Sequence, residues 1–317
     1  MYNTHFGFTN TPFSLAPDTG QFVNLQGHQE CFDLLVYALS TGEGFVKIIG
    51  DVGTGKTILC RKLIRYLEQP SRKNKGKKRK SPFKPVYIPN PLLSPIGLLR
   101  AIAHELGVLA SDETELDALI KQVSDEMLVL ADQDQSVVVI IDEAQALPEE
   151  TLESLRLVTN LETETRKLVQ VVLFGQTELE STLNKHEFRQ LKQRITFSYQ
   201  LEPLSQSSTE QYLNVRTMKV GFTGEPLFRG AAAKKMFMYS GGVPRLINVL
   251  AHKALLSAYS DGRKKVTAGD VKKAWQDGRS ENSGINRGWL IAFTFLALIA
   301  AAISWAKWFG GLAGGAL

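Results

Sequence analysis

The chain has 317 residues, of which 44% are hydrophobic and 22% are charged, a balance that is sufficient to build a buried core. Only two cysteines are present, Cys31 and Cys60, which excludes a disulfide framework and a cysteine-based metal site. The five histidines are scattered without the spacing of metal ligands, so we expect them to be structural. The N-terminal residues lack the charged and then apolar pattern of a secretory signal.

The net charge of +5 comes from one short segment, SRKNKGKKRKS. It contains seven positive residues and no negative one: Arg72, Lys73, Lys75, Lys77, Lys78, Arg79 and Lys80. Subtracting these seven from +5 leaves the rest of the chain at about −2. Prolines at 70 and 85 bound the segment and indicate a basic loop over 71–85. Between Arg72 and Lys80 it could bind anionic lipid or nucleic-acid phosphates, and the alternative is a solvated insertion without a ligand.

Strands and helices alternate through the first two thirds of the chain. Apolar, β-branched runs predict five strands: GFVKIIG, PVYIPN, SVVVIIDEA, KLVQVVLFG and RITFSYQLEPL. Helical periodicity predicts helices in TILCRKLIRYL, in ELDALIKQVSDEMLVLA and in SPIGLLRAIAHELGV, which Ser94 and Pro95 begin. The run SVVVII does not alternate, as expected for a parallel strand covered on both faces. We therefore predict an α/β domain over 41–204.

The strand patterns stop after Leu204. INVLAHKALLSA places its apolar residues on one helical face, and VTAGDVKKAW begins with Thr267 as a helix cap and Asp270 three residues later. Residues 205–277 are therefore predicted to form a small all-helical domain.

The segment GDVGTGKT fits the P-loop pattern G-x-x-x-x-G-K-[ST] and lies between a predicted strand and a predicted helix. Backbone N–H groups of such a loop surround phosphate oxygens, and the helix that follows directs its positive end at the anion. We expect these residues to bind ATP: Gly50, Asp51, Val52, Gly53, Thr54, Gly55, Lys56 and Thr57. Lys56 would contact the β- and γ-phosphates, and Thr57 would bind Mg²⁺. A glycine-rich turn without a ligand is the alternative.

Two carboxylates end the most apolar predicted strand, in VVVIIDEAQ. In a nucleotide triphosphatase, Asp142 would hold Mg²⁺ and Glu143 would polarise the attacking water. A strand-end carboxylate can also serve only to cap the next helix, but two such residues after five apolar ones favour ATP hydrolysis.

Together these motifs resemble the AAA+ ATPases, and in particular the bacterial ExeA/MshM group, which is linked to general secretion and to mannose-sensitive haemagglutinin pilus biogenesis. The opening YNTHFGFTNTPFSLAPDTGQFVNLQGHQECFDLLVYAL, the later GQTELESTL and the still later GGVPRLINVLAHKALLSA are similar to segments of that group. The resemblance covers residues 2–278. It implies a P-loop AAA+ domain, a helical lid and an N-terminal segment, 1–40, that contributes to the nucleotide site.

Three further site residues are implied by the resemblance. Gln176 would orient the attacking water, and Arg245 would link the lid to the nucleotide. Arg194 would act as an arginine finger in the site of a neighbouring subunit, with Arg189 as the competing position and an ordinary surface salt bridge as the alternative. An arginine that acts in a neighbouring subunit implies homo-oligomers whose assembly depends on nucleotide.

The C-terminal segment predicts a membrane anchor. Residues 289–306 contain no charge, and as a helix they span about 27 Å, close to the thickness of a bilayer core. Trp289, Trp305 and Trp308 lie where interfacial aromatic residues are found, and Lys307 follows the apolar run. We predict a linker at 278–288, a single transmembrane helix at 289–308 and a short tail at 309–317. The alternative is a hydrophobic helix packed into the lid or an oligomer interface.

Arg279 and Arg287 precede the span and only Lys307 follows it, so the positive-inside rule predicts a cytoplasmic ATPase domain. The resemblance implies that the anchor lies in the bacterial inner membrane. The expected function is ATP hydrolysis that supports assembly of a pilus or type II secretion-like apparatus, together with inner-membrane assembly proteins. The resemblance is to a short form without a periplasmic peptidoglycan-binding domain. The alternatives are a DNA-handling ATPase similar to transposition helper proteins, and a scaffold whose ATP site switches assembly without turnover.

Overall fold

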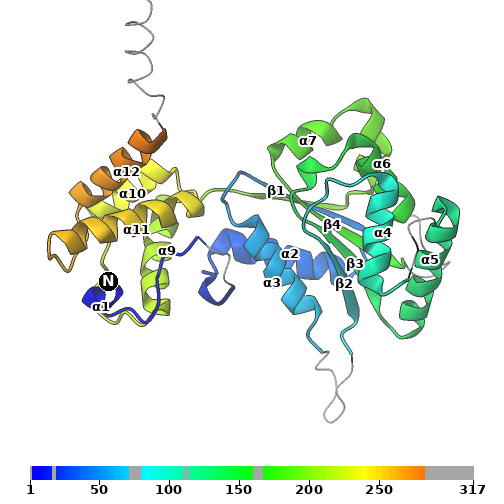
Figure 1. Cartoon of the computed structure of the whole chain (residues 1–317), viewed down its shortest axis with the longest axis horizontal. Helices are drawn as coiled ribbons and strands as arrows, with labels where there is room; N and C mark the ends of the chain where they lie inside the picture. The colour runs from blue at the N-terminus through cyan, green and yellow to red at the C-terminus, as the bar shows by residue number, and fades with distance from the viewer. Residues whose placement is uncertain are drawn as a thin grey trace, which may run out of the picture.

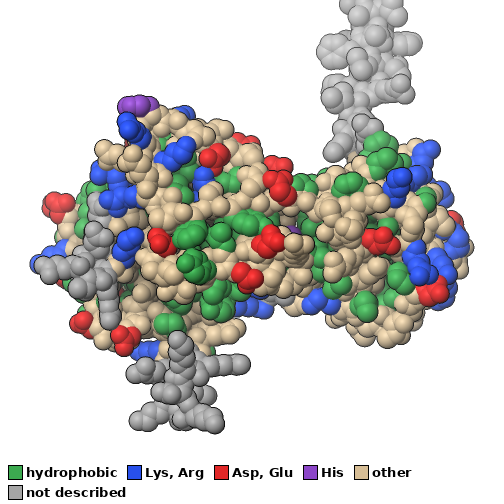
Figure 2. Space-filling view, turned by 180° about the vertical axis from the view of Figure 1, so that it is seen from behind, with side chains coloured by type: hydrophobic (Ala, Val, Ile, Leu, Met, Phe, Trp, Pro, Cys, Tyr) green, Lys and Arg blue, Asp and Glu red, His purple; other side chains and the backbone are tan. Residues whose placement is uncertain are grey.

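The computed structural model describes residues 2–15, 19–70, 80–109, 111, 114–159 and 167–282. They form a larger α/β domain and a smaller helical domain, which lie side by side in Figure 1. Viewed from behind, the two domains meet at a narrower waist (Figure 2). The basic segment apart from Lys80 lies outside the described residues, as does the predicted span at 289–308. No helix within the described ranges combines the length and the apolar character needed to cross a bilayer.

The α/β domain is built on five parallel strands in the order β2-β3-β4-β1-β5. Their bounds are β1 Phe45–Gly50, β2 Phe83–Ile88, β3 Ser136–Ile141, β4 Val169–Gly175 and β5 Phe197–Leu201. All five strands predicted from apolar runs are confirmed, but β2 begins at Phe83, so residues 83–85 of the predicted loop at 71–85 are strand. The strands are parallel, so their carboxyl ends lie along one edge, where the P-loop follows β1 and the acidic pair follows β3.

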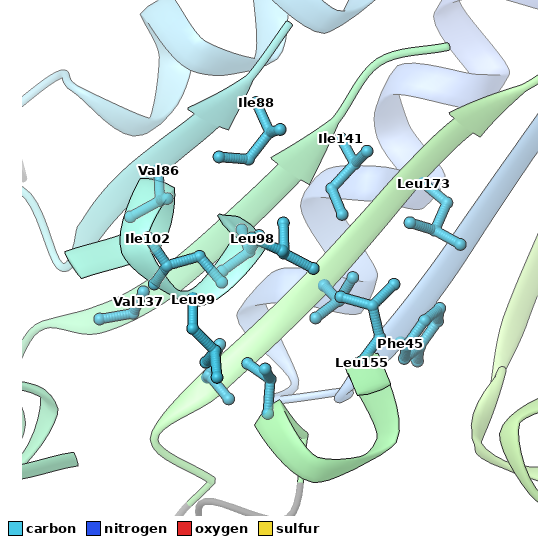
Figure 3. Close-up of a cluster of buried hydrophobic side chains, with 14 of the residues drawn as sticks. Phe45, Val86, Ile88, Leu98, Leu99, Ile102, Val137, Ile141, Leu155 and Leu173 are labelled. Atoms are coloured by element: carbon cyan, nitrogen blue, oxygen red, sulfur yellow. The ribbon is translucent and has the colours of Figure 1, made fainter. Parts of the chain in front are cut away.

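Helices cover both faces of this sheet because alternate residues of each strand point to opposite sides. Helices α2, Gln26–Ser40, and α3, Lys56–Leu67, pack on the face that carries Val138 and Ile140. The other face carries Val137 and Ile141. Within the described residues, five helices cover it: α4 (Pro95–Leu106), α5 (Leu116–Asp132), α6 (Glu149–Val158), α7 (Thr177–Leu183) and α8 (Arg189–Arg194). Figure 3 shows this second core, where Leu98 and Ile102 of α4 lie over the strands.

The helical domain consists of α9, Gln206–Lys219, α10, Ala231–Ser240, α11, Pro244–Ser260, and α12, Ala268–Asn282. The predicted capping box at the start of α12 is present. The backbone N–H of Thr267 donates to Asp270 Oδ2 over 2.8 Å, and the N–H of Asp270 donates to Thr267 Oγ1 over 3.4 Å. Helix α12 continues to Asn282, so the segment expected to be a linker from 278 begins as helix.

The N-terminal segment is divided between the two domains, where the sequence suggested one unit over 1–40. Helix α1, Tyr2–Phe6, and the turns after it pack into the core of the helical domain. The Tyr2 hydroxyl lies 2.9 Å from His252 Nδ1, and the Phe13 ring meets the Phe228 ring edge-on. Helix α2 instead packs on the sheet. Four short helices bury little apolar area on their own, and the N-terminal aromatic rings add to it.

Candidate nucleotide site

A cavity of 370 Å³ lies between the P-loop and the helical domain. It brings together several residues that the sequence predicts to act on ATP: Val52, Gly53, Gly55, Lys56, Thr57, Glu143, Gln176 and Arg245. Gly50 ends β1, Asp51 and Thr54 lie in the loop, and Asp142 is buried at the end of β3; these four do not line the cavity. Ser14 and Leu15 of the N-terminal segment also line it, so the contribution of that segment to nucleotide binding stays a prediction.

The P-loop wraps around the Lys56 ammonium. Lys56 begins α3 and is buried, and its Nζ donates to the carbonyls of Gly50, over 2.7 Å, and Asp51, over 2.9 Å. Burial lowers the pKa of Lys56, although the nearby carboxylates of Glu143 and Asp142 favour the charged form. Lys56 therefore places a positive charge at the N-terminal end of α3, where a phosphate group would be attracted.

His28 of α2 holds the P-loop from behind. Its Nε2 lies 2.9 Å from the carbonyl oxygen of Thr54, and its side chain is buried. Gly55 has a φ of 108°, and a Cβ there would lie 2.9 Å from His28 Nε2, so only glycine fits. The sequence led us to expect a structural histidine. It did not show that the residue supports the phosphate loop.

Asp142 and Thr57 provide oxygen ligands suited to Mg²⁺. Burial raises the pKa of the Asp142 carboxyl, while hydrogen bonds from the Thr57 hydroxyl and the Glu143 N–H oppose this; the N–H donates over 3.0 Å. The strand end and the helix start therefore bring a carboxylate and a hydroxyl together. Mg²⁺ prefers hard oxygen donors of this kind, so the residues present fit the ion.

Glu143 is held in an unusual position. Its φ of 52° and ψ of 40° are left-handed, a conformation that non-glycine residues adopt at a cost of about 1–3 kcal/mol and that is found most often at functional sites. Its Oε2 accepts hydrogen bonds from Gln176 Nε2, over 3.1 Å, and from Gln145 Nε2, over 2.6 Å. The structure thus brings Gln176 to Glu143. The sequence analysis did not single out Gln145, although it stands two residues after the acidic pair.

Arg245 is at the start of α11, directly above the P-loop. Its backbone N–H donates to the carbonyl of Gly53 over 3.2 Å, and its side chain is exposed along the cavity. A Cβ on Gly53 would lie 2.7 Å from the Cβ of Arg245. The two domains touch here at backbone distance, so a nucleotide in the cavity would contact both.

The helical domain also fixes the N-terminal segment beside the cavity. Arg216 of α9 is buried and lines the cavity. Its Nε donates to the carbonyl of Pro12 over 2.7 Å, and its guanidinium also donates to Gln21 Oε1 over 2.9 Å. Arg216 is a second residue that the motifs did not reveal, because its partners lie some two hundred positions away in the sequence.

Arg194 and Arg189 lie away from this cavity. Arg194 donates to Thr159 Oγ1 over 3.0 Å and lines a separate cavity of 310 Å³ beside Phe45, the first residue of β1. The P-loop follows the other end of that strand. Arg189 is exposed at the start of α8. Neither arginine lines the nucleotide cavity of its own chain, so a role in a neighbouring subunit stays a prediction.

Comparisons with known proteins identify the family and the fold of the chain. Residues 39–183 match the family described as AAA domain. The chain is 36% identical to general secretion pathway protein A of Aeromonas hydrophila over 311 residues, 98% of this chain and 54% of that protein. It therefore spans about half the length of this relative.

Solved structures share the fold at low sequence identity. Cdc6p from Pyrobaculum aerophilum has a TM-score of 0.61 at 18% identity, covering 83% of this chain and 69% of that one. The ORC2 protein of Aeropyrum pernix, solved in ADPNP–ADP complexes, has a TM-score of 0.58 at 18% identity, covering 84% of this chain and 71% of that one. Together with the site geometry, these matches show that the chain is a homologue of general secretion pathway protein A with an AAA-type P-loop ATPase fold.

Proposed function

We propose that this chain binds ATP with Mg²⁺ in the cavity between its domains and hydrolyses it. The observation that carries the proposal is the convergence of Lys56, Glu143 and Arg245 on one cavity, from three separate elements. Charges of both signs are therefore placed where a triphosphate needs cations and an attacking water needs a base.

Each residue has a distinct part in this reaction. The P-loop N–H groups and Lys56 bind the phosphates, and Arg245 brings positive charge from the helical domain. Thr57 and Asp142 would hold Mg²⁺, which neutralises charge on the phosphate oxygens when bound. Glu143 accepts a proton from the attacking water, and Gln176 lies within hydrogen-bond distance of Glu143 to help orient that water.

We further propose that the ATPase domain works at the cytoplasmic face of the bacterial inner membrane, anchored by 289–308, where it supports assembly of a pilus or a type II secretion-like apparatus. Similarity to general secretion pathway protein A over nearly the whole chain supports a role in secretion or pilus assembly. The uncharged run at 289–306 supports the anchor.

The test is phosphate release by the full chain in lipid vesicles, with ATP and Mg²⁺. Glu143→Gln should bind ATP normally and lose at least about 100-fold of the turnover, the contribution expected of a general base. Lys56→Ala should lose ATP affinity as well. A wild-type protein that binds ATP without turnover would support the scaffold alternative and overturn the hydrolysis proposal.

The cellular role is tested in parallel. In cells that lack the protein, the wild type should restore secretion or surface pili, and Glu143→Gln should not. Deletion of 289–308 should release the protein from membranes. DNA binding that disappears when the positive residues between Arg72 and Lys80 are neutralised, together with ATPase stimulation by DNA, would favour the DNA-handling alternative.

A further inference from the structure

The amide of Gln145 is fixed at both ends. Its Oε1 accepts the backbone N–H of Gln176 over 3.0 Å, and its Nε2 donates to Glu143 Oε2 over 2.6 Å. An amide oxygen can only accept, and an amide NH₂ can only donate. Because the oxygen is already matched to a backbone N–H, the NH₂ group must face the carboxylate. The orientation of the side chain thus follows from its chemistry.

This bridge joins two elements that meet at the edge of the sheet. Gln145 lies in the short 3₁₀ turn Ala144–Ala146 that follows Glu143, and Gln176 is the residue between β4 and α7. The side chain of Gln176 also reaches the same Glu143 oxygen, over 3.1 Å. Two amide donors therefore converge on Oε2 from two elements, which leaves Oε1 to accept a hydrogen from water.

The strained backbone of Glu143 must be held in place by neighbouring groups, and the bridge through Gln145 is one of them. With a left-handed φ of 52°, the residue is in a conformation that persists only where the surrounding structure enforces it. The Asp142 carboxylate accepts the Glu143 N–H over 3.0 Å and fixes the backbone, but it does not fix the side chain. The amides of Gln145 and Gln176 do so.

We propose that Gln145 is a positioning residue for ATP hydrolysis, whose amide aims the Glu143 carboxylate by tying it to the backbone of Gln176. This inference rests on the proposed role of Glu143 as the base. Gln145 does not touch the reacting atoms; it acts through Glu143, and its loss should lower turnover while ATP affinity stays unchanged.

Two substitutions at Gln145 test the bridge in the full chain. Gln145→Leu keeps the size and removes both hydrogen bonds, whereas Gln145→Glu keeps the shape but replaces the donor with an acceptor that repels the carboxylate. We expect kcat to fall by about tenfold or more for Gln145→Leu, and further for Gln145→Glu, since a misaimed base loses most of its contribution. The dissociation constant for a fluorescent ATP analogue should stay within about twofold of the wild-type value.

The decisive measurement is a double-mutant cycle with Glu143→Gln. If Gln145 acts only through Glu143, Gln145→Leu will not reduce the residual turnover of Glu143→Gln any further. Losses that multiply would overturn the inference. A kcat of Gln145→Leu equal to the wild-type value would do the same.

The matched control is Gln170→Leu, at a buried glutamine whose side chain also bridges two groups. Its Nε2 donates to the carbonyls of Leu39 and Glu43 near the start of β4, away from the cavity. This variant should lower the unfolding midpoint and leave kcat per folded molecule unchanged. If Gln145→Leu folds poorly, its kcat can be corrected for the fraction of molecules that bind the ATP analogue, and Gln145→Glu provides a second variant for the same comparison.

Failure of the proposed function and failure of this inference give different results. If the wild type has no ATPase activity, the proposed function is wrong. If the wild type is active and all Gln145 variants are equally active, only the inference about Gln145 is wrong.

Discussion

The Nε2 atom of His28 lies 2.9 Å from the carbonyl oxygen of Thr54, so helix α2 supports the phosphate loop from the side opposite the cavity. The carbonyl can only accept, so Nε2 carries the hydrogen. Burial lowers the pKa of the imidazole, and the nearby Lys62 acts in the same direction, against the opposing effect of the hydrogen bond. His28 is therefore neutral in the folded protein near pH 7.

This shifted pKa predicts a loss of stability in mild acid. The unfolded chain binds a proton at His28 below about pH 6.5, whereas the folded chain resists it, so stability is complete above that pH and falls as the pH drops below it. The midpoint of urea unfolding should decline in this range for the wild type and decline less for His28→Gln. His104→Gln, at an exposed histidine, should retain the wild-type dependence. If the urea midpoint declined equally with pH in the wild type and in His28→Gln, His28 would not be the cause of the decline.

The buried carboxylate of Asp270 predicts a second, more acidic transition. Burial raises the pKa of Asp270, but hydrogen bonds from Arg263, Ser257 and Thr267 outweigh it and hold the pKa well below its ordinary value. Its stabilisation is thus present above about pH 3.9 and is lost as the pH falls through that value toward the folded pKa.

Asp270→Asn should lower the free energy of unfolding by about 2–3 kcal/mol. This loss is smaller than that expected for breaking a fully buried ion pair, because Arg263 is partly exposed to solvent. Thermal unfolding of the variant measures this cost. The control is Glu225→Gln, an exposed carboxylate paired with Lys265, which should leave the unfolding temperature close to that of the wild type because solvent screens the pair. Similar losses in the two variants would contradict the argument from burial.

The close approach of Gly53 to Arg245 predicts a specific loss of nucleotide binding. Gly53→Ala places a methyl group 2.7 Å from the Cβ of Arg245 and strains a backbone with a φ of 85°, which would push the helical domain from the P-loop. ATP affinity should fall by about tenfold, the equivalent of 1.4 kcal/mol. Gly42→Ala has a similar φ, 77°, but open space around it. It should lose about 1 kcal/mol of stability and retain ATP affinity, measured by titration of a fluorescent analogue.

Arg194 can be tested by mixing two inactive variants. If Arg194 acts in the site of a neighbouring subunit, a mixture of Arg194→Ala and Lys56→Ala will regain turnover, because some assembled sites combine an intact P-loop with an intact arginine. Arg189→Ala in place of Arg194→Ala tests the competing position. If the mixture stays inactive although light scattering confirms assembly, Arg194 does not act in a neighbouring site, and its role is the structural hydrogen bond with Thr159.

The sequence predicts the α/β sheet, the helical domain and the central motif because their information is local. Unbroken runs such as Val137–Ile141 in β3 identify parallel strands, and the P-loop places Lys56 and Thr57 together along the chain. Asp142 and Glu143 are adjacent in sequence; Glu143 lines the cavity, and Asp142 accepts a hydrogen bond from Thr57, which also lines it. The P-loop and the acidic pair each lie within one short stretch of sequence, so a local pattern is enough to predict them.

The residues that the sequence left unrecognised depend on contacts between distant segments. His28 meets Thr54 across 26 positions, and Gln145 meets Gln176 across 31. Arg216 meets Pro12 across 204 positions. No periodicity or spacing encodes such pairs, since each partner is an ordinary polar residue until the fold brings the two together. The basic loop and the membrane anchor stay predictions.

The hydrogen bond between Tyr2 and His252 means that the helical domain is assembled from both ends of the described chain. During synthesis the aromatic residues of α1 leave the ribosome before the α/β domain, and α9 to α12 follow that domain. The α/β domain can therefore fold before α9 to α12 are available to pack against α1. Any rotation of the helical domain that follows nucleotide binding must carry the N-terminal segment with it, so Ser14 and Leu15 would move as part of the wall of the cavity they border.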